Sequence, residues 1–232
     1  MVFFYIKQMY NFIDNARYRL YNYFMLEENF MKIIKYEKKK NDEYLIYFDD
    51  GNKINIKEDV ILKYKLLYKK EIDNNLVKKL MDDNLEFDVY DKCVRYISVR
   101  LRSINEIREY MLRKGVDDLV IEDVICRLIK NKLLDDDRFA MAFIKDKLNF
   151  TTMGPYRIEL ELKKHKIDDS IIKQHIYDID DKIINDKINK QINKIIKSNK
   201  NKPNLKNKVY SNLLNLGYSS ECILENLSKY NL

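Results

Sequence analysis

The stretch "IREYMLRKGVDDLVIEDV", residues 107–124, decides the fold because its pattern recurs twice along the chain. The corresponding stretches are "IELELKKHKIDDSIIKQH", residues 158–175, and "VYSNLLNLGYSSECILEN", residues 209–226, so the period is 51 residues. A fixed period with matching apolar positions indicates repeated supersecondary units. The matching positions are Ile107, Ile158 and Val209; Met111, Leu162 and Leu213; Ile121, Ile172 and Ile223; Ile125, Ile176 and Leu227.

Each repeat carries a turn signal at its centre. Gly115 and Gly217 stand where a helix ends in the left-handed conformation, which glycine adopts at little cost. Lys166 takes their place in the second repeat, which predicts strain or a different cap there. The residue two positions further on can accept hydrogen bonds from the first N–H groups of a new helix, and it is Asp117, Asp168 or Ser219.

Two more helix starts complete the repeats. Ser103 and Glu106 have the spacing of a capping box, and Gly154-Pro155 places a proline where a first helical turn accepts it. We therefore predict three helices in each repeat. They cover residues 89–100, 103–114 and 117–131; then 135–149, 154–165 and 168–178; then 181–198, 203–216 and 219–229.

The residues before the repeats have a different pattern. Asp50-Gly51 lies between two alternating runs, which is a strong hairpin signal because the turn needs positive φ angles. Residues 31–58 should form a small antiparallel sheet, which needs a helix to lean on. Residues 1–30 match no pattern in the rest of the chain, and we interpret them as an upstream extension with Met31 as the true start. A short amphipathic helix over Tyr5–Phe24 is the alternative.

The predicted fold class is mainly α, with three tandem three-helix repeats in an elongated array preceded by a small antiparallel β-sheet subdomain. Only 4 Gly and 2 Pro in the chain agree with long helices. The expected domains are the N-terminal segment 1–30, a β-hairpin and helix domain 31–88, and repeats 89–132, 133–179 and 180–232.

The chemistry-bearing residues give little sign of a reaction centre. The 3 Cys and 2 His are scattered, so neither a zinc site nor a disulfide framework nor any cofactor is indicated. No apolar run reaches the length of a membrane helix, and we expect a soluble, cytoplasmic monomer. We expect no enzymatic activity.

The run "LDDDRFA", residues 134–140, raises the question of a metal or acid/base site. Consecutive helical residues point about 100° apart, so Asp135, Asp136 and Asp137 cannot all converge on one ion as a metal-dependent nuclease would need. We interpret them as the start of a helix, with Asp135 as its cap and acids near the positive end of the dipole. Phe139 and Ala140 should then face inward between repeats.

Positive charge is concentrated near residues 182–208, where nine lysines accompany one acid, Asp186. An isoleucine stripe at Ile184, Ile188, Ile192 and Ile195 predicts a helix whose outward face carries Lys187, Lys190, Lys194 and Lys197. Such a face suits phosphate groups. A solvated lysine-rich surface is an equally simple interpretation.

Three segments together resemble the RecX family of RecA regulators. They are "YISVRLRSINEIREYMLRKGV" (residues 96–116), the Asp-rich run with Arg138-Phe139-Ala140, and "GPYRIELELKKHKI" (residues 154–167). The resemblance is strong over residues 90–177, and Lys166 departs from the glycine that the family usually has. The resemblance implies a non-enzymatic protein that binds along the groove of the RecA–DNA filament and thereby affects recombination, repair and the SOS response. Members of the family inhibit RecA more commonly than they activate it, so the resemblance implies an inhibitor.

The candidate contacts to RecA or DNA are basic side chains, because guanidinium and ammonium groups bind carboxylate or phosphate. The alternative for each arginine is that it only braces a neighbouring carboxylate of the same protein, as Arg108 could brace Glu106 or Glu109. A helical DNA-binding or scaffold protein unrelated to RecA is the alternative function. The candidates are Arg95, Arg100, Arg102, Arg108, Arg113, Arg138, Arg157, Lys163, Lys164, Lys187, Lys190, Lys194 and Lys197.

Overall fold

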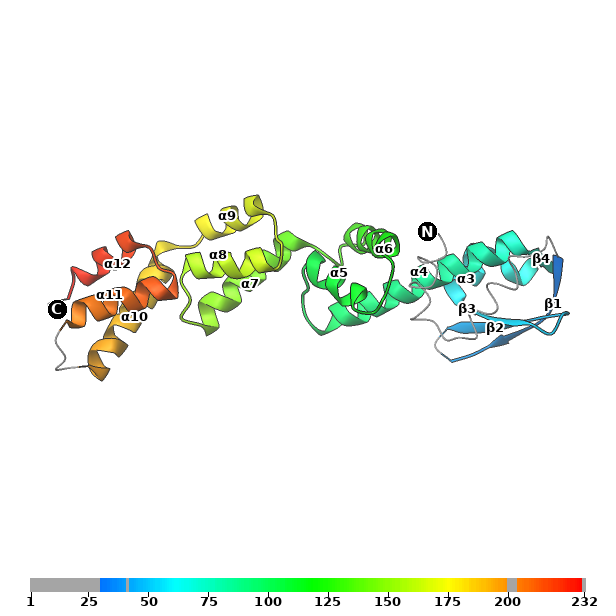
Figure 1. The fold of residues 1–232 in the computed structure, drawn as a ribbon, viewed down its shortest axis with the longest axis horizontal. Helices are drawn as coiled ribbons and strands as arrows, with labels where there is room; N and C mark the ends of the chain where they lie inside the picture. The colour runs from blue at the N-terminus through cyan, green and yellow to red at the C-terminus, as the bar shows by residue number, and fades with distance from the viewer. Residues whose placement is uncertain (1–29, 41, 200–203, 231–232) are drawn as a thin grey trace. The chain divides into compact units, whose positions relative to one another are not determined.

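The computed structural model describes residues 30–40, 42–199 and 204–230. Within them the protein is mainly helical and carries a four-stranded antiparallel sheet at its N-terminal side, which confirms the predicted fold class (Figure 1). Contacts divide the chain into two compact units. The first holds the described residues up to Leu101 together with Ile107–Leu134, and the second holds Arg102–Glu106 together with the described residues from Asp135 onward. The interpretation of residues 1–30 falls on residues outside the described ones, apart from Phe30.

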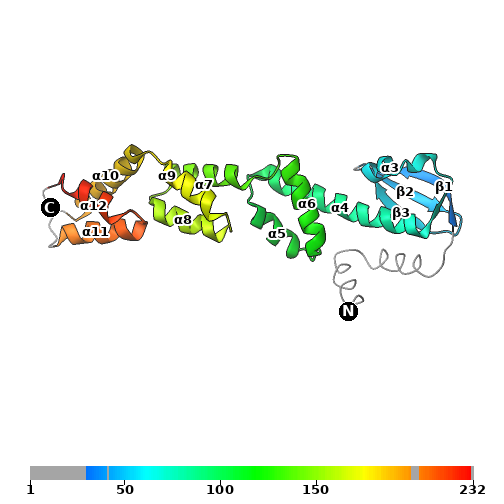
Figure 2. The ribbon, with the colours of Figure 1, turned by 90° about the horizontal axis from the view of Figure 1, so that it is seen from above.

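The sheet consists of β1 (Phe30–Lys38), β2 (Glu43–Phe48), β3 (Lys53–Lys57) and β4 (Glu71–Asp73), in the order β3-β2-β1-β4. Figure 2 shows β1, β2 and β3 side by side. The predicted hairpin is confirmed: β2 pairs with β3, and Gly51 in the turn has a φ of 85°. The fourth strand was not predicted. It has three residues and pairs with Phe30–Lys32. A strand of this length is too short for an alternating pattern to be seen in the sequence.

One face of the sheet is covered by α3 (Glu58–Lys63), the 3-10 helix η1 (Leu66–Tyr68) and the first half of α4 (Asn74–Val99). The core between them is apolar and fully enclosed, with Ile46, Val60, Leu66, Val77 and Leu80 at 0% exposure. The helix support that the small sheet needs is therefore supplied by the segments next to it in the chain.

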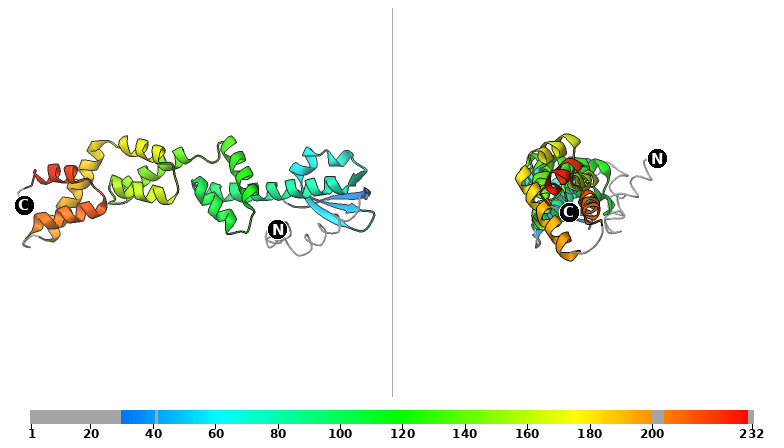
Figure 3. Two further views of the ribbon diagram at one scale, coloured as in Figure 1. Left: turned by 45° about the horizontal axis from the view of Figure 1, so that its top comes forward. Right: turned by 90° about the vertical axis from the view of Figure 1, so that its left-hand side faces the viewer.

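Helix α4 differs from the prediction of a helix beginning at residue 89. It begins at Asn74, directly after Asp73, whose carboxylate accepts a hydrogen bond from the Leu76 N–H at 2.6 Å. No glycine or proline interrupts its 26 residues, so nothing stops the helix at residue 88. Its second half buries Val89 and Cys93 and contacts α6, so one helix serves the sheet and the first repeat (Figure 3).

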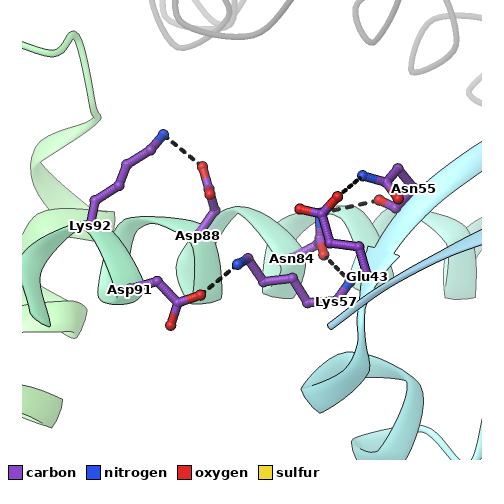
Figure 4. Close-up of polar contacts among 7 residues, drawn as sticks. All are labelled: Glu43, Asn55, Lys57, Asn84, Asp88, Asp91 and Lys92. Atoms are coloured by element: carbon purple, nitrogen blue, oxygen red, sulfur yellow. Dashed lines mark hydrogen bonds and ion pairs between the residues drawn. The ribbon is translucent and has the colours of Figure 1, made fainter. Parts of the chain in front are cut away.

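A side chain of α4 forms hydrogen bonds with the backbone of β3, which is an edge strand of the sheet. The Asn84 Oδ1 atom accepts a hydrogen bond from the Lys57 N–H at 2.7 Å, and Asn84 Nδ2 donates to the Asn55 carbonyl at 3.4 Å (Figure 4). The Lys57 ammonium lies 2.5 Å from Asp91, further along the same helix. Asn84 thus takes the place of a neighbouring strand at an edge that would otherwise expose unpaired backbone groups.

The predicted helices of the repeats are present, with ends shifted by a few residues. They are α5 (Ile104–Leu112) and α6 (Asp118–Lys130); α7 (Asp136–Phe150), α8 (Pro155–Lys164) and α9 (Asp169–Tyr177); α10 (Asp181–Ser198), α11 (Leu205–Leu216) and α12 (Ser220–Leu227). Each set of equivalent apolar residues is buried to between 0% and 3% exposure, with the exception of Ile176, which is half-buried. The 51-residue pattern therefore marks true core positions.

The three central turns share one geometry. The φ angles of Gly115, Lys166 and Gly217 are 74°, 54° and 91°, so all three helices end in the left-handed conformation. Lys166 adopts the same cap as the glycines, at a cost of about 1 kcal/mol for a residue with a Cβ atom. The next helix in each repeat is capped as predicted, by the side chain of Asp117, Asp168 or Ser219.

Candidate functional site

The three carboxylates after Leu134 have three different partners. Asp135 caps α7 by accepting hydrogen bonds from the Asp137 and Arg138 N–H groups at 2.9 and 3.1 Å. Asp136 accepts from the Ile104 N–H, at the start of α5, at 2.8 Å. Asp137 lies 2.8 Å from His175 Nε2. The carboxylates therefore hold separate elements in place, and no cluster of metal-binding side chains occurs among the described residues.

Phe139 and Ala140 face inward as predicted, at 4% and 0% exposure. The Phe139 ring contacts Phe143 and His165 of the same repeat, so the prediction that it lies between repeats is not confirmed. The roles of Asp136 and Asp137 were missed. Their partners lie 32 and 38 residues away along the chain, and no local pattern in the sequence connects them.

Most candidate arginines near the first repeat have partners within the protein. Arg108 forms a fork on Glu122 with N–O distances of 2.7 and 3.0 Å, which lowers the pKa of that carboxyl. The bracing alternative was right in kind for Arg108, which pairs with the carboxylate of Glu122. Arg102 and Arg113 each lie 4.0 Å from a carboxylate of their own segment, and Arg100 donates to the Leu101 carbonyl at 2.8 Å.

The second repeat shows the same division. Lys163 lies 2.8 Å from Glu159, Lys164 lies 2.6 Å from Glu161, and Arg157 donates to the Asn215 carbonyl at 3.4 Å. Arg95 and Arg138 are exposed, and neither side chain has an ion pair with any residue in the described ranges. The charge of these two arginines is therefore available to a partner.

Helix α10 presents the lysine-rich face. Ile188 and Ile192 are fully buried and Ile195 nearly so, which confirms the predicted isoleucine stripe at these three positions, whereas Ile184 is half-buried. On the opposite side three lysines at helical spacing are exposed, and none of them has a hydrogen bond or ion pair with another described residue. They are Lys190, Lys194 and Lys197.

Lys187 does not belong to this face, so the prediction that it points outward is wrong. Its ammonium group donates to the carbonyl oxygens of Leu148 and Thr151 at 2.5 and 2.6 Å, at the end of α7. The last carbonyls of a helix have no partner within it and attract a cation, which explains the position. Burial, and then the charge of Lys190, lowers the pKa of the Lys187 ammonium.

One further cation was not singled out from the sequence. The Arg127 guanidinium lies 4.3 Å from the ring centres of both Phe87 and Tyr90 and 3.5 Å from Glu86. The spacing of Phe87 and Tyr90 on one helical face was the only signal available. This stack joins α4 to α6 and is a structural contact of the first repeat.

In the part of the chain that the structure describes, no helix is both long and apolar enough to cross a bilayer.

Two family models match the chain in tandem. One is described as "RecX, first three-helix domain" and matches residues 90–128, and the other is described as "RecX, second three-helix domain" and matches residues 135–176. These ranges coincide with the second half of α4 to α6 and with α7 to α9.

Similar proteins carry the same family name. A "Regulatory protein RecX" from Lactococcus lactis subsp. lactis is 31% identical over 78% of this chain and 70% of its own length. One from Halalkalibacterium halodurans is 29% identical over 60% of this chain. The match spans about half the length of that relative and of one from a Geobacillus species, 54% and 52% respectively.

Two solved structures are also similar. A crystal structure of regulatory protein RecX has a TM-score of 0.75 and covers 84% of this chain and 99% of its own, at 22% identity. The crystal structure of RecX from Lactobacillus salivarius has a TM-score of 0.60 and covers 65% of this chain and 97% of its own, at 26% identity. The first likeness supports the fold alone. Because both three-helix domains match and a relative is 31% identical over more than two thirds of its length, the chain belongs to the RecX family.

Proposed function

We propose that this protein regulates the RecA recombinase, as an inhibitor, by binding along the groove of the RecA–DNA filament. Such binding would affect recombination, DNA repair and the SOS response. The observation that carries the proposal is membership of the RecX family, with both of its three-helix domains in tandem. We further propose that it acts in the cytoplasm as a monomer without enzymatic activity.

The exposed lysines of α10 supply the contact with phosphate in this proposal. Lys190, Lys194 and Lys197 are solvent-exposed and unpaired among the described residues, so they can meet an anion without first leaving a partner. Each lysine that neutralises a phosphate releases a counterion, which makes affinity fall as salt rises. Lys187 is left out of this set because two carbonyl oxygens already hold its ammonium.

The arginines divide in the same way. Arg95 and Arg138 are the best candidates for contacts with acidic groups of RecA or with DNA, because a guanidinium forks onto either group. Arg108, Lys163 and Lys164 each have a carboxylate within 3 Å, and engaging a partner would cost them that pair. Their contribution should therefore be smaller.

The test is the DNA-dependent ATP hydrolysis of RecA, measured on single-stranded DNA with the protein added at sub-stoichiometric ratios. An inhibitor that binds the filament should slow hydrolysis at ratios well below one, since one bound molecule affects several RecA subunits. Unchanged hydrolysis at every ratio, together with intact binding to DNA, would reject the regulation of RecA and favour a helical DNA-binding or scaffold protein.

A further inference from the structure

A groove of about 560 Å³ lies where the second repeat meets the third. Its walls come from the start of α8, the end of α9, the start of α10 and the turn from α11 to α12. All of these belong to the second compact unit. The side chains that give the groove its chemical character are Tyr156, Glu159, Ile176, Tyr177, Asp181 and Leu214.

The walls of the groove are fixed by backbone contacts. The Gly154 N–H donates to the Leu216 carbonyl at 2.7 Å, and the Tyr156 N–H donates to the Gly217 carbonyl at 3.1 Å. The positive end of α8 thus meets the negative end of α11. A Cβ atom on Gly154 would lie 2.5 Å from the Gly217 oxygen, so only glycine permits this approach. A groove with fixed walls needs little ordering when it binds a partner.

Among the equivalent apolar residues of the three repeats, Ile176 is the one whose side chain is not fully buried. Its equivalents Ile125 and Leu227 are 3% and 2% exposed, whereas Ile176 is half-buried and lines the groove. Leu214, on the facing wall, is 46% exposed. The second repeat therefore leaves part of its apolar surface open at this place.

Two tyrosines flank that apolar surface. Tyr177 is 88% exposed and Tyr156 is 62% exposed, which are high values for such large side chains. Exposed tyrosines beside apolar side chains are typical of the central contacts of protein–protein interfaces.

The charge of the groove is opposite to that of the whole chain. The chain carries a net charge of +7, yet the charged residues that line the groove are Glu159 and Asp181, both acidic. Glu159 shares its charge with Lys163 at 2.8 Å. Asp181 has no ion pair with any residue that the structure describes, so its carboxylate is available to a cation from outside.

We propose that this groove binds a segment of RecA that presents an arginine or lysine next to a large apolar side chain. The apolar side chain would pack on Ile176 and Leu214, and the cation would lie against Asp181 and over the ring of Tyr177. Because the partner is the RecA filament, this proposal rests on the proposed function. It adds a protein contact to the phosphate contact of α10.

The experiment measures the affinity of the full chain for RecA filaments assembled on single-stranded DNA. The test variant is Tyr177→Ser with Asp181→Lys. The matched control is Tyr68→Ser with Asp118→Lys, because Tyr68 is also 88% exposed and Asp118, like Asp181, is the first residue of a helix capped by an aspartate. Neither control residue lines the groove. Circular dichroism of both variants checks that the helices remain.

We expect the test variant to bind the filament about tenfold more weakly than the control, as for the loss of central interface contacts. The single change Asp181→Asn, which keeps the shape of the side chain, should weaken binding in the same direction by a smaller factor. Equal affinity of the test and control variants, with the wild type binding tightly, would overturn the groove proposal and leave the proposed function standing. Absence of binding by the wild type would overturn both.

Discussion

Lys187 and Lys190 lie one turn apart on α10, and their ammonium groups have different surroundings. Lys187 donates to two carbonyl oxygens at the end of α7, whereas Lys190 projects into solvent with Lys194 and Lys197. The first belongs to the junction between the second and third repeats, and the others form an open basic surface. In a run of like charges, packing decides which cations hold the fold and which are available to a partner.

The backbones of the two repeats also approach each other closely at this junction. Gly217 would place a Cβ atom 2.6 Å from the Arg157 nitrogen, whereas the space around the equivalent Gly115 is open to 4 Å. The two glycines share the left-handed conformation, but only Gly217 also permits a close approach between repeats. Changes to the close backbone contact or to Lys187 should therefore affect stability, and changes on the basic surface should affect binding.

The largest expected effect is that of Gly217→Ala on the free energy of unfolding. The alanine would be strained both by its left-handed conformation and by the contact with Arg157, together about 3 kcal/mol. Gly115→Ala meets only the first cost, about 1 kcal/mol, and is the matched control. Urea unfolding measures both, and equal losses would show that the close approach at the junction contributes nothing.

A smaller loss is expected for Lys187→Met. The methionine keeps most of the apolar stem but leaves the Leu148 and Thr151 carbonyls without their donor, at a cost of about 2 kcal/mol. Lys190→Met removes a charge from solvent and should change stability by no more than about 0.5 kcal/mol. Thermal unfolding of the two variants tests whether Lys187 stabilises the fold and Lys190, one turn further along the helix, does not. Equal losses of stability would contradict this difference.

The smallest expected effect is a change of stability with pH, which comes from the half-exposed ion pair between Arg108 and Glu122. Arg108 lowers the pKa of Glu122 below its usual 4.5, so the pair stabilises the fold above that value. This contribution is lost as pH falls through the lowered pKa, because the folded state must then take up a proton. Since Glu122 is 50% exposed, we expect less than about 1 kcal/mol. As pH falls, the stability of Glu122→Gln should lack this part of the loss that the wild type shows. The same pH dependence of stability in the variant and the wild type would contradict the prediction.

Local patterns in the sequence predicted much of the fold. The repeats follow from apolar spacing and from caps at Asp117, Asp168 and Ser219, which act within a few residues. The hairpin follows from Asp50-Gly51. These features depend on neighbours in the chain, so a single sequence is enough to find them.

Features set by distant partners were out of reach. The pairing of Asp136 with Ile104, the carbonyls that hold Lys187 and the strand β4 each depend on residues more than 30 positions away. The groove between repeats is of the same kind, because Ile176 has the same pattern as its buried equivalents and differs only in what packs on it. The sequence therefore predicted a set of basic residues that could bind a partner. The contacts in the structure divide this set into residues held by other groups of the protein and residues open to solvent.

The most direct test of the account is the salt dependence of binding to RecA filaments on single-stranded DNA. The triple variant Lys190→Gln, Lys194→Gln, Lys197→Gln is compared with the wild type and with Lys187→Gln. We predict that the slope of log affinity against log salt becomes shallower in the triple variant, by about 0.7 for each lysine that meets a phosphate, and stays unchanged in Lys187→Gln. An unchanged slope in the triple variant would contradict the claim that the open lysines of α10 contact the filament.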